Sequence, residues 1–131
     1  MGQHQARRPV SKAEQVILDG LKRLTDRLPE VTVERDGFGH SVLKAGKRSF
    51  VIVGEGDGER PTLSIKTDPV TQDLLVQQGI FQRTPFIGQH GWVTAWGKSP
   101  DLPWSTIEGL VEDAWRAVAP KRLLKKLDEG G

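Results

Sequence analysis

The sequence predicts an α+β fold, a two-layer sandwich in which a mostly antiparallel sheet carries helices on one face. Apolar residues recur every three or four positions in residues 11–28 and 104–118, which is typical of amphipathic helices. They recur every second position in much of residues 31–66, which is typical of strands. The predicted order is helix, three or four strands, helix, two strands, helix, with no internal repeat or linker.

The first helix is predicted to begin at Ser11 and to end at Pro29. Ser11 and Glu14 form a capping-box pattern, in which each side chain binds a backbone N–H group at the start of the helix. Pro29 ends the pattern because proline has no N–H group to donate. The apolar stripe consists of Ile17, Leu21, Leu24 and Leu28.

Strands are predicted next, because apolar and polar side chains alternate. Their ranges are 31–33, 40–44, 48–53 and 62–66. Ala45-Gly46-Lys47 is typical of a tight hairpin turn between the second and third of these strands. Residues 54–60 are rich in glycine and predict a long solvated loop.

A second helix is predicted over residues 69–78, burying Leu74 and Leu75. Asp68 followed by Pro69 is typical of a helix start, and Gly79 is typical of the position after a helix end. Two further strands, 81–86 and 92–96, flank a turn-rich loop.

A third helix follows Pro103 and ends at Pro120, with Ser105 and Glu108 as a second capping box, and a short amphipathic turn, 121–127, comes last. The predicted core between sheet and helices consists of Leu21, Leu24, Phe50, Ile52, Leu63, Ile65, Leu75, Trp92, Leu110 and Trp115.

The 131 residues fit one domain, which we expect over residues 11–127 between a flexible N-terminal tail, 1–10, and a C-terminal tail, 128–131. Cysteine is absent, which excludes disulfides, thiolate catalysis and cysteine-ligated zinc. No segment approaches the ~18 apolar residues of a membrane span. A cytoplasmic protein with no membrane association is expected, and its oligomeric state stays open.

The motifs of common catalytic and cofactor sites are missing. The 54–60 loop lacks the Lys-Ser/Thr pair of a phosphate-binding loop and does not fit the calcium-binding loop pattern. No serine stands in a nucleophile elbow, and His4, His40 and His90 lack the spacing of a metal site. We therefore expect no enzyme, no cofactor and no metal.

His90, within Gly-Gln-His-Gly-Trp, is the candidate functional histidine because loops carry function more often than cores do. A locally hydrogen-bonded turn residue is the structural alternative. An enzyme would have to draw on His90, His40 and Asp68.

Basic side chains gather in two places, although the formal net charge is only +2. One cluster lies on the hairpin near residue 46, and the other lies after Pro120. Each cluster taken alone is also typical of a solvated helix or hairpin surface. The residues are Lys44, Lys47, Arg48, Lys121, Arg122, Lys125 and Lys126.

Four stretches of the sequence resemble motifs of the MmcQ/YjbR-like family. They are Leu28-Pro29 with Phe38-Gly39-His40, Val42-Leu43, Gly46-Lys47 and Phe50; Leu63-Ser64-Ile65-Lys66-Thr67-Asp68-Pro69; Gly88-Gln89-His90-Gly91-Trp92-Val93; and Trp115-Arg116-Ala117-Val118-Ala119-Pro120-Lys121-Arg122. The resemblance covers residues 11–127. It implies an α+β fold shaped like secretion-chaperone and frataxin-like domains, and DNA binding through wing-like hairpins.

The first functional hypothesis is a non-enzymatic module that binds double-stranded DNA, with the seven basic residues contacting phosphates. The alternative is a protein-interaction adaptor or chaperone-like domain that uses an exposed apolar patch. Exposure of Phe86 or Trp96 would favour the adaptor, and convergence of the two basic clusters would favour DNA.

Overall fold

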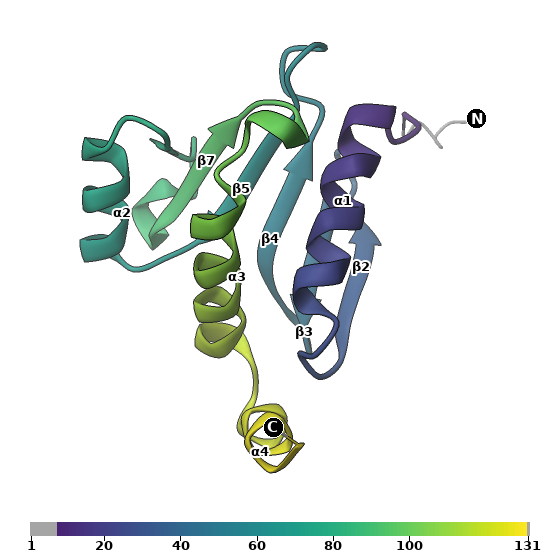
Figure 1. Cartoon of the computed structure of the whole chain (residues 1–131), viewed down its shortest axis with the longest axis vertical. Coiled ribbons are helices and arrows are strands. Elements are labelled where there is room, and N and C mark those ends of the chain that lie inside the picture. The colour runs from purple at the N-terminus through teal and green to yellow at the C-terminus, as the bar shows by residue number, and fades with distance from the viewer. Residues whose placement is uncertain (1–7, 131) are drawn as a thin grey trace.

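A computed structural model describes residues 8–130, which form four helices and six strands in one unit (Figure 1). The helices are α1 (Lys12–Thr25), α2 (Pro69–Gln77), α3 (Trp104–Val118) and α4 (Lys121–Gly130), with short 3-10 turns η1 (Gly88–His90) and η2 (Ser99–Asp101). The strands are β2 (Val31–Arg35), β3 (Ser41–Ala45), β4 (Arg48–Gly54), β5 (Thr62–Lys66), β6 (Gln82–Arg83) and β7 (Trp92–Trp96).

All six strands form one antiparallel sheet in the order β2-β3-β4-β5-β7-β6. Helices α1 and α3 pack on one face of this sheet, in front of it in Figure 1. Helix α4 follows α3 and lies below it in the same view. The α+β prediction, with helices on one face, is therefore confirmed. The opposite face, turned away from the viewer in Figure 1, is called the open face below.

The core lies between the sheet and the helices. Alternate strand residues such as Val51, Ile65 and Val93 sit in register on the helix-facing side, and Trp115 of α3 is fully buried against them. Six predicted core residues belong to this cluster, namely Leu21, Phe50, Leu63, Ile65, Leu75 and Trp115, with Leu24 and Leu110 packed on it.

The prediction that Ile52 and Trp92 belong to this core is wrong. Ile52 lies between Val51 and Val53, which face the helices, and Trp92 directly precedes Val93, which also does. The strand alternation therefore turns both Ile52 and Trp92 toward the open face. Trp92 is nevertheless buried there, whereas Ile52 is half-buried.

The helix ends follow the predicted chemistry in two of three cases. Ser11 and Glu14 form the reciprocal capping box at α1, and the Asp68 side chain accepts a hydrogen bond from the Thr71 N–H group at α2. The predicted box at Ser105 is wrong, because α3 begins at Trp104, two residues before the first helical residue that a Ser105 cap would give. The Trp104 indole donates to the Ser99 carbonyl at 2.7 Å and fixes that earlier start.

Three other local predictions differ from the structure. Leu74 is exposed, because only the adjacent Leu75 faces the sheet. The strand predicted over 81–86 shrinks to β6, because Pro85 has no N–H group for the ladder. Helix α4 continues to Gly130 rather than ending at Leu127. No helix within residues 8–130 is long and apolar enough to cross a membrane.

Candidate nucleic-acid interface

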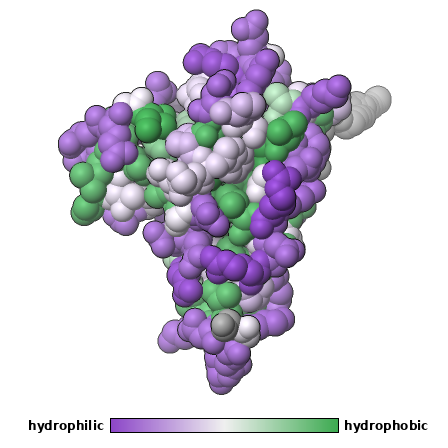
Figure 2. Space-filling model, in the orientation of Figure 1, coloured by the Kyte–Doolittle hydropathy of each residue, from purple (hydrophilic) through white to green (hydrophobic). Residues whose placement is uncertain are grey.

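The two basic clusters meet at one groove, which we call the basic groove. It has a volume of about 480 Å³ and lies between the turn that joins β3 to β4 and the junction of α3 with α4. Lys47 and Arg48 line it from the turn, and Lys121 and Arg122 line it from the start of α4. Residues more than seventy positions apart in the sequence therefore contribute cations to one surface. Figure 2 shows that the lower end of the molecule, formed by α4, is mostly hydrophilic.

A glycine permits this convergence. Gly46 has φ +63°, a conformation that side chains rarely adopt, and a Cβ atom there would lie 3.3 Å from Cδ of Pro120. The turn can thus approach the α3–α4 junction closely. Pro120 also ends α3, so the same residue begins the change of direction that presents the charges of α4.

Glutamates pair with three of the seven predicted cations. Arg122 and Lys126 lie 2.9 and 3.8 Å from the Glu30 carboxylate, and Lys44 lies 3.4 Å from that of Glu34. The hydrogen bond from Arg122 holds the pKa of Glu30 below its usual range. The other four cations have no carboxylate within 4.0 Å among residues 8–130; they are Lys47, Arg48, Lys121 and Lys125.

Not all seven residues line the groove. Lys44 is half-buried on β3, and Lys125 and Lys126 are exposed one turn further along α4. The groove itself therefore brings together four of the seven. The remaining three flank it on the elements that form its walls.

The 54–60 loop is acidic in sequence, but its charges are partly compensated within the fold. Glu55 binds Arg8 at 2.7 Å, and Asp57 binds Arg60 at 3.1 Å. Backbone N–H groups of Arg60 and Glu59, together with the Arg60 side chain, lower the pKa of Asp57 to about 2. The loop is thus bonded both within itself and to Arg8, and it lies at the end of β4 opposite the basic groove.

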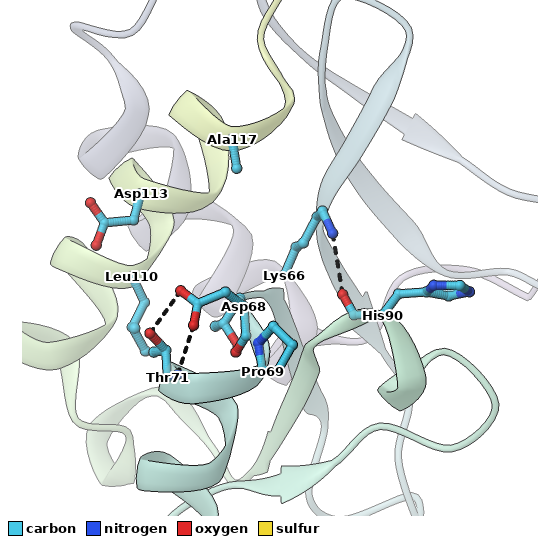
Figure 3. Close-up of a pocket in the computed structure, with 9 residues that line it drawn as sticks. Lys66, Asp68, Pro69, Thr71, His90, Leu110, Asp113 and Ala117 are labelled. Carbon is cyan, nitrogen blue, oxygen red and sulfur yellow. Dashed lines mark hydrogen bonds between the residues drawn. The ribbon is translucent and has the colours of Figure 1, made fainter.

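His90 lines a separate pocket of about 290 Å³ between β5, α2 and α3 (Figure 3). Its imidazole points away from the other labelled side chains, while its carbonyl accepts a hydrogen bond from Lys66. The Asp68 carboxylate is used by Thr71, so it does not pair with His90. This geometry fits the turn-residue interpretation of His90, and Asp68 serves as a helix cap.

Gly91 and Gln72 explain why the loop at residues 88–92 has its shape. A Cβ atom on Gly91 would lie 2.0 Å from the Thr67 carbonyl oxygen, so only glycine fits. The buried Gln72 amide donates to the Gly88 and Trp92 carbonyls at 2.6 and 2.9 Å. Sequence reasoning missed Gln72, because a lone polar residue on a short helix carries no pattern.

His40 differs from His90 in having a carboxylate partner. Its Nδ1 atom lies 3.1 Å from the Asp36 carboxylate. Burial raises the pKa of Asp36, but hydrogen bonds from the backbone of His40 and Phe38 and from the His40 ring outweigh burial and lower it. Within residues 8–130 no three histidine, aspartate or glutamate side chains are grouped as metal ligands would be.

Sequence reasoning also missed a second groove, which lies on the open face. We call it the aromatic groove because three exposed aromatic side chains line it, namely Phe38, Phe86 and Trp96. Their exposed fractions are 86%, 95% and 39%. Phe86 and Trp96 are the residues whose exposure favours the adaptor alternative.

The family model described as YjbR matches residues 26–117. A solved structure, that of the Deinococcus radiodurans protein DR2400 with its DUF419 domain, is similar to this chain with a TM-score of 0.65 and 20% identity. The similarity covers 85% of this chain and 87% of DR2400. No curated protein matches the chain.

The chain belongs to the YjbR family, and the family prediction is confirmed. The likeness to DR2400 supports the fold. The matched segment includes Lys47 and Arg48 but ends before α4, so the basic residues of α4 are a feature outside it.

Proposed function

We propose that this protein is a non-enzymatic module that binds double-stranded DNA by its phosphates at the basic groove. The observation that carries the proposal is the convergence of Lys47 and Arg48 with Lys121 and Arg122 on one groove. Phosphate contacts of this kind position a protein on a duplex without reading its sequence. We therefore expect affinity with little sequence preference.

Unpaired cations are the part of this surface that should bind most directly. Lys47, Arg48, Lys121 and Lys125 need not leave a protein carboxylate to meet a phosphate. Arg122 and Lys126 must exchange Glu30 for the phosphate, which reduces their net contribution. The turn between β3 and β4 supplies the hairpin contact, whereas the 54–60 loop brings carboxylates that phosphate would avoid.

The test measures binding of a fluorescently labelled short duplex by anisotropy at about 50 mM salt, where non-specific binders register at micromolar concentration. The variants Lys47→Ala/Arg48→Ala and Lys121→Ala/Arg122→Ala should each weaken binding about tenfold or more. Lys12→Ala/Lys22→Ala is the matched control, because it removes two exposed cations of α1. No binding by the intact protein, or equal losses in the control, would contradict the proposal.

The adaptor alternative is favoured by a different observation, the exposure of Phe38, Phe86 and Trp96. A second copy of the chain is the partner that can be tested directly. If the aromatic face pairs two copies, sedimentation should show a concentration-dependent dimer that Phe38→Ser/Phe86→Ser abolishes. A monomer at every concentration would remove self-pairing as a role of this face.

A further inference from the structure

The aromatic groove has a polar floor that a protein-docking face does not require. Its volume is about 560 Å³, within the usual range for small-molecule sites. The floor includes Ser64 of β5 and Thr94 of β7, both nearly buried. Thr84, which follows β6, completes the floor at the edge of the sheet.

The three floor hydroxyls form one chain. The Ser64 and Thr94 oxygens are 2.8 Å apart, and the Thr84 and Thr94 oxygens are also 2.8 Å apart. Three hydroxyls carry three hydrogens, whereas the chain contains only two hydrogen bonds. One O–H donor therefore has to find an acceptor outside the chain. Because all three residues line the groove, an atom held in the groove can take the place of water as that acceptor.

The rim supplies flat apolar surfaces above this floor. Trp96 lies at one side, with the Arg60 guanidinium 5.5 Å from its ring. Phe38 lies near His40, with ring centroids 6.3 Å apart. Aromatic side chains placed around a groove favour an aromatic ligand, which stacks on one ring or meets the edge of another.

Phe86 is held at the rim in an unfavourable conformation. Its φ is +68°, and the Ile87 N–H group donates to the Pro85 carbonyl at 2.7 Å. This is the positive-φ form of the γ-turn, which is rare and strained. The ring is also 95% exposed. Strain that holds an apolar ring in solvent at the mouth of a groove is typical of a binding site.

The charged and titratable groups at the groove have partners within the protein. Arg60, at its border, binds Asp57, and His40 lies 3.1 Å from the Asp36 carboxylate. Arg83 also lines the groove and has no carboxylate within 4.0 Å among residues 8–130, but its guanidinium donates a hydrogen bond to the Gln72 side-chain oxygen at 3.0 Å. A ligand there does not need a charge of its own. The basic groove differs in this respect and lies at the other end of β3.

From these observations we infer that the aromatic groove binds a small, uncharged aromatic heterocycle. The ring lies among Phe38, Phe86 and Trp96, and an acceptor atom on its edge receives the free O–H donor of the Ser64, Thr94 and Thr84 chain. This site is independent of the proposed DNA contact, because the two grooves share no lining residue.

Two probes test the inference, and protein NMR shifts at millimolar probe concentration report their binding. Adenosine is an uncharged heterocycle with acceptor nitrogens, and indole offers an aromatic ring with an N–H donor but no acceptor nitrogen. Both should shift the backbone amides of Thr84, Phe86 and Ile87 and those of residues 94–96. Ribose, which has no aromatic ring, should shift neither group of amides.

The triple variant Ser64→Ala/Thr84→Val/Thr94→Val removes all three hydroxyls at nearly constant shape, a change that leaves no orphaned partner. It should weaken adenosine binding about tenfold and indole binding less, because indole has no acceptor nitrogen for the free O–H donor. Phe86→Gly, at an exposed position, should weaken both probes and serves as the second variant if the triple variant does not fold. Leu74→Ala, an exposed apolar residue of α2, is the matched control.

Absence of binding by both probes would overturn the inference. Equal effects of the triple variant on adenosine and indole would overturn the role of the hydroxyl floor and leave the face to a protein partner. Weakening by Leu74→Ala to the same extent would show that the probes bind apolar surface without a site.

Discussion

The basic groove and the aromatic groove stand at opposite ends of β3, and they differ in how their charges are arranged. At the basic groove, Lys47, Arg48 and Lys121 have no acidic partner within salt-bridge distance among the residues described. At the aromatic groove, Arg60 and His40 both do, and the lining Arg83 donates instead to the Gln72 side-chain oxygen. Unpaired charge favours a polyanion, whereas paired charge around aromatic rings favours an uncharged ligand. The two surfaces are therefore distinguished by whether their cations have partners in the protein, more than by how many cations they carry.

The largest expected effect is a loss of fold stability in Trp115→Ala, which would disturb both grooves. Trp115 is fully buried in the core that supports the whole sheet. Trp115→Ala should reduce the free energy of unfolding by about 3–5 kcal/mol, measured by chemical denaturation. Trp115→Phe should cost much less, because the Trp115 indole N–H has no hydrogen-bond partner to lose. Equal stability of Trp115→Ala and the parent would contradict the position of the core.

Gly46→Ala should weaken binding at the basic groove and leave binding at the aromatic groove unchanged. The added methyl group would be strained at φ +63° and would press on Pro120, so stability should fall by about 1 kcal/mol and duplex affinity should fall with it. Gly58→Ala is the control, since Gly58 also has positive φ, +94°, but has open space around it. Anisotropy with the duplex and NMR with adenosine would be measured for both. Loss of adenosine binding in Gly46→Ala would contradict the separation of the grooves.

Acid should weaken the contacts that Arg8 makes with Glu14 and with the loop beside the aromatic groove. Glu14 is fully buried and binds Arg8 at 2.6 Å, while Arg8 also binds Glu55 of the loop beside that groove. Burial raises the pKa of Glu14, but hydrogen bonds from Arg8 and Ser11 outweigh it and lower the pKa. A lowered carboxyl pKa stabilises the fold above the unfolded pKa, about 4.3, and that contribution is lost as pH falls through the folded pKa.

Glu14→Gln should therefore show a weaker loss of stability below about pH 4.3 than the parent does. Thermal unfolding over a pH series measures this. Glu108→Gln, an exposed position on α3, serves as the control and should keep the parent's pH dependence. Identical acid sensitivity of Glu14→Gln and the parent would show that the Arg8 contact does not contribute.

The smallest effect is expected at Glu30. Glu30→Gln frees Arg122 and Lys126 from a carboxylate, so duplex affinity should rise about two- to fivefold, as expected from the small energy of an exposed ion pair. Glu34→Gln, beside Lys44 and outside the groove, should raise it less. Unchanged affinity in Glu30→Gln would place Arg122 and Lys126 outside the contact.

Local chemistry made most of the fold predictable from sequence. The Ser11 capping box, the Asp68 cap and the Gly46 turn are set by neighbouring residues, and all three occur as expected. Ile52 and Leu74 were misplaced because hydropathy does not say which side of a strand or helix faces the core. Strand pairing and helix packing decide that question.

The two grooves show the same limit for the site. The cations of the basic groove were visible as two clusters, although only the fold brings Lys47 beside Lys121. The hydroxyl chain cannot be predicted from the sequence, because strand register brings Ser64 beside Thr94 and the turn after β6 adds Thr84. The sequence predicts Phe86 within a strand, whereas β6 ends at Arg83 and Phe86 has positive φ after Pro85.

The salt dependence of duplex affinity tests the central claim most directly. With four unpaired cations contacting phosphates, the logarithm of the association constant should fall against the logarithm of salt concentration with a slope of about −3.6. Lys47→Ala/Arg48→Ala should bring the slope to about −1.8, because two of these contacts are removed. A slope near zero, or an unchanged slope in this variant, would contradict phosphate binding at the basic groove.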